Sequence, residues 1–135
     1  MMVMLQILNN RKSDKKMKAK IFFSDFDYNE INASGWQCEE GKLYLALTDP
    51  LNNRSIDAID DCLEKKKFKY IGEIDAKNEN EVWARIQNVN SSHELNNRSM
   101  MVGDIIVFET YGVVVESTGF SELSGEQIEK FKKIK

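Results

Sequence analysis

Four acidic side chains recur at helical spacing near the middle of the chain. Asp57, Asp60, Asp61 and Glu64 stand at positions i, i+3, i+4 and i+7, which an α-helix places on one side. Like charges at this spacing repel each other slightly, so they do not favour the helix itself. They could imitate nucleic-acid phosphates and dock against a basic groove. The alternative is a solvated face whose first acids complement the helix dipole. We call these four residues the acidic face.

Residues suited to nucleophilic or acid–base catalysis are few and scattered. His93, the single histidine, lies in a polar stretch beside Ser91 and Ser92, and Ser99 follows. No Gly-x-Ser-x-Gly or Ser-x-x-Lys motif surrounds a serine, and the seven glycines form no phosphate-binding loop. We therefore predict that the chain is not an enzyme. A cleft built from His93, Asp25 and a serine is the alternative.

Candidate metal ligands are also sparse. Asp25, Asp27 and Glu30 lie close in the sequence and could bind a divalent cation, but they lack the glycine and the downstream bidentate glutamate of a calcium loop. Cys38 and Cys62, with one histidine, are too few for a closed zinc site. We expect no cofactor, no bound metal and two reduced thiols.

Two arginines and two aromatic residues are candidates for contacts with a partner. The tetrapeptide Leu-Asn-Asn-Arg occurs three times, beginning at Leu8, Leu51 and Leu95. Its flanks differ, so it marks no repeat architecture, and the turn chemistry of asparagine explains it. The alternative is that Arg54 and Arg98 present guanidinium groups on equivalent loops, to phosphates or to an acidic surface. Tyr28 and Trp36, near predicted loops, are candidate interface anchors.

Length and composition favour one soluble domain. The chain has 135 residues, is 41% hydrophobic and 30% charged, and carries a net charge of −3. A mild acidic charge argues against a sequence-independent nucleic-acid binder, which usually has a strong basic excess. We expect an N-terminal extension at 1–16 and one domain at 17–135. No apolar run reaches the roughly 20 residues of a membrane span, and charges follow the apolar start rather than precede it. We therefore predict a bacterial cytoplasmic location and no membrane partner.

The hydrophobic pattern predicts an α+β domain. We expect a mostly antiparallel sheet of five to six strands with about three helices on one face, and a partly closed barrel is the alternative. Residues 28–34 are expected to form a loop. Helices are expected to begin near three good N-caps, Ser55, Asn78 and Ser124. The expected strands cover residues 18–27, 36–38, 42–47, 69–75, 105–109 and 113–117.

A motif near the end of the chain resembles a known family. Ser99-Met-Met-Val-Gly-Asp104 leads into Ile105-Ile-Val-Phe108, and Gly119-Phe120-Ser-Glu-Leu123 follows. This order is similar to the ending of the YodL-like domains, small proteins of phages and conjugative elements. The resemblance covers roughly residues 79 to 123, including a short predicted helix that ends in asparagine. It implies a phage or mobile-element setting rather than an activity.

These features lead to two functional hypotheses. The first is a non-enzymatic viral or mobile-element protein for counter-defence, an anti-CRISPR-like inhibitor. It would bind a host protein, such as a nucleic-acid-guided nuclease, and block its nucleic-acid channel with the acidic face. The second is a small nucleic-acid-binding accessory domain whose basic residues near 11–20, 65–69 and 130–135 would contact phosphates. Cys38, Cys62 and exposed strand edges leave a homodimer open.

Overall fold

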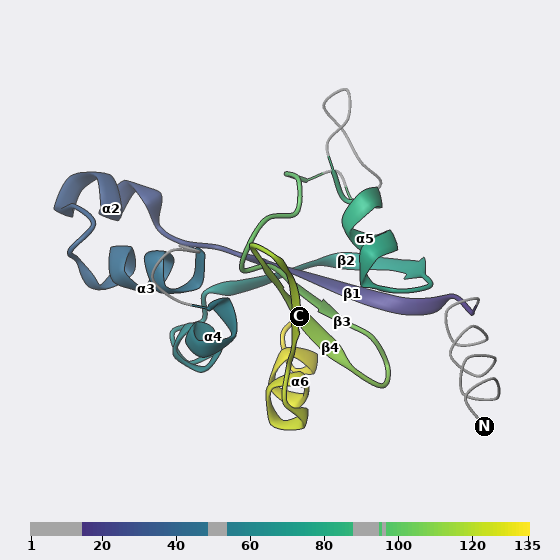
Figure 1. The fold of residues 1–135 in the computed structure, drawn as a ribbon. Helices are drawn as coiled ribbons and strands as arrows, with labels where there is room; N and C mark the ends of the chain where they lie inside the picture. Colours follow the sequence, from purple (N-terminus) through teal and green to yellow (C-terminus); the bar gives the residue numbers. More distant parts are fainter. Residues whose placement is uncertain (1–14, 49–53, 88–94, 96) are drawn as a thin grey trace.

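An antiparallel sheet forms the centre of the computed structural model, which describes residues 15–48, 54–87, 95 and 97–135 (Figure 1). Five strands lie in the spatial order β2-β1-β3-β4-β5, so among the described residues the sheet stays open and the barrel alternative is wrong. All four pairings are antiparallel, as predicted. The strands are β1 (Met17–Ser24), β2 (Phe68–Ala76), β3 (Ile105–Val107), β4 (Gly112–Glu116) and β5 (Gly119–Glu122).

The helices lie on both faces of the sheet. Helix α5 covers one face, and α4 and α6 cover the other (Figure 1), so the prediction of a single helical face is wrong. Five helices are described instead of about three, because α2 and α3 occupy a stretch predicted as a loop and a hairpin. The helices are α2 (Tyr28–Ser34), α3 (Glu39–Thr48), α4 (Ser55–Glu64), α5 (Glu79–Arg85) and α6 (Gly125–Lys132).

Strand β1 is a central strand with apolar residues on both of its faces. It pairs with β2 on one side and β3 on the other. Ala19, Ile21 and Phe23 face the core beneath α5, whereas Phe22 faces the core beneath α4 and α6. Because side chains alternate between the two faces of a strand, β1 contributes residues to two separate cores.

Helix α2 forms where we expected a loop. The Asp27 side chain caps it by accepting a hydrogen bond from the Glu30 backbone N–H, at 3.0 Å. Ile31 is 2% exposed and anchors the helix. A single apolar contact in a polar stretch gives too weak a periodicity to predict seven helical residues.

Helix α3 replaces the hairpin predicted at residues 36–47. Gly41 is not a turn residue: a Cβ at this position would lie 2.6 Å from the backbone oxygen of Trp36, so the glycine permits a close approach. Glu40 is buried, where it accepts a hydrogen bond from the Asp27 N–H and pairs with Lys67. These contacts with distant segments select a helix from a sequence whose leucines also alternate like a strand.

The C-terminal elements follow the prediction with one addition. The β3–β4 hairpin is present, and Ser124 forms the predicted capping box with Gln127 at the start of α6. Gly119 does not end the sheet, however. It opens β5, which pairs with β4 and becomes the far edge of the sheet.

Candidate functional site

The acidic face lies on the exposed side of α4. Ala58, Ile59 and Cys62 turn the other side of the helix into the core, which leaves all four acidic residues exposed. None of the four forms an ion pair with a described residue. Asp60 accepts one hydrogen bond from Gln127 Nε2 of α6, at 3.2 Å. The spacing argument therefore placed these residues correctly, and the structure leaves their charges uncompensated.

Negative charge is concentrated on one part of the molecule. Residues 25–64 contain ten acidic and two basic residues, a net charge of −8, which leaves +5 for the remainder of a chain with net charge −3. Helices α2, α3 and α4 come from this segment, with α2 and α3 beyond one end of the sheet and α4 next to them (Figure 1). We call residues 25–64 the acidic lobe. Its field extends over the surface that includes the acidic face.

Some of the basic residues are paired with acids. Lys65 Nζ lies 3.0 Å from Glu39, and Lys18 Nζ lies 3.4 Å from Glu73. Lys67, Lys130 and Lys132 also form ion pairs. Exposed pairs contribute little to stability, but they cancel much of the local positive field. Five of the lysines assigned to phosphate contacts thus already form an ion pair within the chain.

Two aromatic side chains project from the acidic lobe. Tyr28 is 45% exposed and Trp36 is 52% exposed. Both rest on Tyr44 of α3, with ring centroids 5.6 Å and 5.5 Å from its ring. Partial burial, with Tyr44 beside it, raises the pKa of Tyr28. Tyr44 therefore holds both predicted anchors in place while about half of their surface remains accessible.

The second tryptophan lies elsewhere. Trp83 of α5 is 37% exposed. Its backbone oxygen accepts a hydrogen bond from Gln87 Nε2, at 2.9 Å. Helix α5 covers the opposite sheet face from α4, so Trp83 is a natural control for Trp36.

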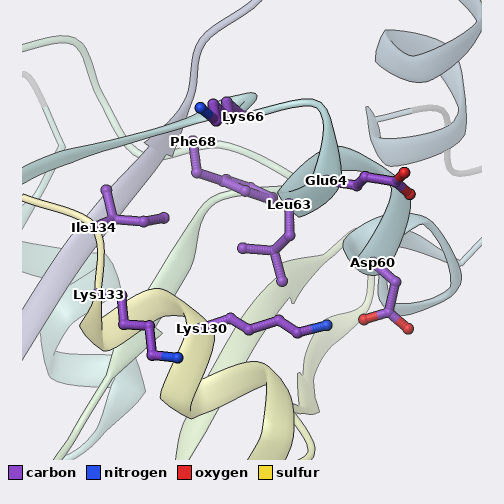
Figure 2. A pocket seen from close by; sticks show the side chains of 8 residues that line it. All are labelled: Asp60, Leu63, Glu64, Lys66, Phe68, Lys130, Lys133 and Ile134. Carbon is purple, nitrogen blue, oxygen red and sulfur yellow. The ribbon is translucent and has the colours of Figure 1, made fainter.

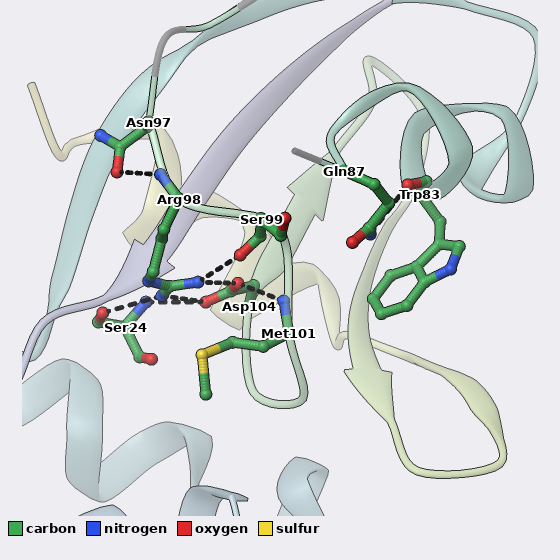
Figure 3. A network of polar contacts seen from close by, with 8 residues as sticks. All are labelled: Ser24, Trp83, Gln87, Asn97, Arg98, Ser99, Met101 and Asp104. Atoms are coloured by element: carbon green, nitrogen blue, oxygen red, sulfur yellow. Dashed lines mark hydrogen bonds and ion pairs between the residues drawn. The ribbon is translucent and has the colours of Figure 1, made fainter. Parts of the chain in front are cut away.

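Arg98 has a structural role, which differs from presenting its guanidinium group on a loop equivalent to that of Arg54. Its guanidinium binds the fully buried Asp104 carboxylate through two bonds, of 2.8 Å and 2.9 Å (Figure 3). The same carboxylate accepts hydrogen bonds from the backbone N–H groups of Ser24 and Met101. Burial raises the pKa of Asp104, and these four hydrogen bonds oppose the rise. We call the contact between Arg98 and Asp104 the clamp; it joins the end of β1 to the segment before β3.

Arg54, the other candidate arginine, and the described candidates for catalysis or metal binding are dispersed. Arg54 is exposed at the start of α4. Asp27 serves as the cap of α2, and the described residues contain no group of three or more His, Cys, Asp or Glu side chains that could hold a metal ion. His93, Ser91 and Ser92 lie outside the described residues, as do the first Leu-Asn-Asn-Arg copy, residues 51–53 of the second copy and most of residues 1–16.

No family model matches the chain, and no curated protein or solved structure matches it significantly. In the part of the chain that the structure describes, no helix is both long enough and apolar enough to cross a membrane.

The two cysteines should differ sharply in reactivity. Cys62 is fully buried, and burial raises its pKa from 9.0 to about 12, whereas Cys38 is partly exposed. The thiolate is the reactive form, so iodoacetamide at pH 8 should modify Cys38 at least about a hundredfold faster than Cys62. Peptide mass spectrometry over time measures both rates. Equal rates in the folded protein would contradict the buried position of Cys62, and urea should abolish the difference.

Proposed function

We propose that this protein is a phage or mobile-element domain that binds a host defence nuclease and occupies its nucleic-acid channel with the acidic lobe. The observation that carries the proposal is the net charge of −8 on residues 25–64, presented partly by an acidic face without ion pairs to described residues. A nucleic-acid channel must be basic because it neutralises phosphates. Such a channel is complementary in charge to this lobe.

The acidic face has a charge density close to that of a nucleic-acid strand. Its four carboxylates span seven residue steps, or about 10 Å at the helical rise of about 1.5 Å per residue. One DNA strand carries a phosphate for about every 3.4 Å along the axis, or about three charges in that length. The face can therefore replace several phosphates in a row.

The exposed aromatics supply the contact area that charge alone lacks. Large rigid rings at the centre of an interface contribute much of the binding energy, and Tyr44 already orders both Tyr28 and Trp36. Binding then costs little side-chain entropy. The resemblance to YodL-like domains supports the phage or mobile-element setting.

Trp36→Ala should weaken binding to an inhibited nuclease by about 30-fold or more, the effect expected of an interface hot spot. Trp83→Ala should change the affinity less than about twofold, because Trp83 lies across the sheet from the acidic lobe. Biolayer interferometry with immobilised guide-loaded nuclease measures both. Comparable losses in the two variants would show that Trp36 is not an anchor.

Cleavage assays test the proposal itself. The protein is titrated into guide-loaded, RNA-guided nuclease complexes, and cleavage of labelled target DNA is followed. We expect at least one complex to be inhibited at a near 1:1 ratio. A gel-shift assay with labelled DNA and RNA runs alongside at low salt. Nucleic-acid binding there, with every nuclease fully active, would replace the proposal with the accessory-domain alternative.

A further inference from the structure

A groove of about 750 Å³ lies between α4 and α6 (Figure 2). Leu63 and Ile134, both half-buried, form its apolar part with Phe68. Asp60 and Glu64 stand on the α4 rim. Lys130 and Lys133 stand on the α6 rim, where Lys130 extends towards α4. Lys66 also lines the groove, next to Phe68. The α4 and α6 rims thus carry opposite charges on either side of an apolar strip.

This pattern limits what can cover the groove. A uniformly basic partner would be attracted by Asp60 and Glu64 but repelled by the lysine rim, and an acidic partner would meet the reverse. A suitable occupant must carry both signs in the opposite order around apolar residues. A second copy of this surface meets that requirement. When it is rotated by half a turn about an axis along the groove, its basic rim faces the acidic rim of the first copy.

We propose that a second copy of this chain covers the groove in a two-fold symmetric dimer. The axis runs along the groove, so Asp60 and Glu64 of each copy oppose Lys130 and Lys133 of the other. The apolar strips face each other across the axis, and the rims that close over them shield Leu63 and Ile134 from solvent. Such an interface is isologous: each contact occurs twice. The dimer covers Asp60 and Glu64 of the acidic face, so the form that binds a nuclease is the monomer. The dimer involves this protein alone, so it goes beyond the proposed function and is tested without any nuclease.

Charge-swapped variants provide the test. Asp60→Lys/Glu64→Lys makes both rims basic, and Lys130→Glu/Lys133→Glu makes both rims acidic. Neither should self-associate well, because each rim then meets its own sign; we expect the dissociation constant to rise at least about tenfold. A 1:1 mixture restores both attractive contacts. We expect the mixture to form a heterodimer with about the wild-type dissociation constant.

Sedimentation velocity from about 10 µM to about 1 mM measures the association. The wild-type mass should rise from 15.6 kDa towards twice that value and should fall back in high salt. Circular dichroism verifies the folding of each variant. If a double variant unfolds, Glu64→Lys and Lys133→Glu replace it, because neither residue forms an ion pair with a described residue. A monomeric wild type at all concentrations, unchanged association of the swapped variants, or a mixture that stays monomeric would each overturn the proposal.

Discussion

Replacing Asp104 with alanine should lower the free energy of unfolding by about 3–5 kcal/mol, as expected when one partner of a buried ion pair is removed. The substitution leaves the Arg98 guanidinium without its carboxylate and removes the acceptor for the N–H groups of Ser24 and Met101. Urea denaturation followed by tryptophan fluorescence measures the loss. The exposed Glu109→Ala should change the same quantity by less than about 0.5 kcal/mol.

A substitution of Arg98 tests whether the clamp stabilises the fold through its specific contacts or through packing alone. Arg98→Lys keeps the charge but loses the two-pronged contact with Asp104 and the stacking over Phe23, where Arg98 Cζ lies 4.1 Å from the ring centroid. It should therefore remain destabilised by more than about 1 kcal/mol. A loss below about 1 kcal/mol for Asp104→Ala would mean that the clamp does not hold β1 to the segment before β3.

Reversing all four charges of the acidic face to lysine should weaken nuclease binding by at least about a hundredfold, because attraction to a basic channel becomes repulsion. The fold should survive, since the four side chains are exposed and form no ion pair with described residues. The matched control has the same change in net charge at four exposed acids outside the acidic lobe, Asp75, Glu109, Glu122 and Glu129.

Biolayer interferometry compares the two charge-reversed variants against one immobilised nuclease. The control should lose affinity less than about tenfold, because its charges act only at long range and are screened by salt. Similar affinities for both variants would mean that net charge, rather than the acidic face, governs binding. Wild-type affinity in the acidic-face variant would contradict the mechanism in which the acidic face takes the place of nucleic-acid phosphates.

Local patterns predicted much of the fold. The alternation in β1, the β-branched runs of the β3–β4 hairpin, and the caps Asn78 and Ser124 each depend on residues near in sequence. Helix α3 was missed because Leu43, Leu45 and Leu47 alternate like a strand. The contacts that decide for a helix, between Gly41 and the Trp36 backbone and around Glu40, involve other segments.

The candidate site was predicted only in part. Helical spacing identified the acidic face, and proximity to loops identified Tyr28 and Trp36, both of which are exposed. The role of Arg98 could not be predicted, because it depends on β1 bringing Ser24 next to Asp104, 80 residues away. The concentration of charge on residues 25–64 was present in the sequence and needed only a segment-by-segment charge count.

The central claim is that the acidic lobe takes the place of nucleic acid on its partner. The most direct test asks whether an inhibited, guide-loaded nuclease can hold this protein and its target DNA together. A preformed complex of nuclease and protein is mixed with excess labelled target and separated by size-exclusion chromatography. We predict mutually exclusive binding, with DNA absent from every fraction that contains both proteins. A stable complex of nuclease, protein and target DNA would contradict it.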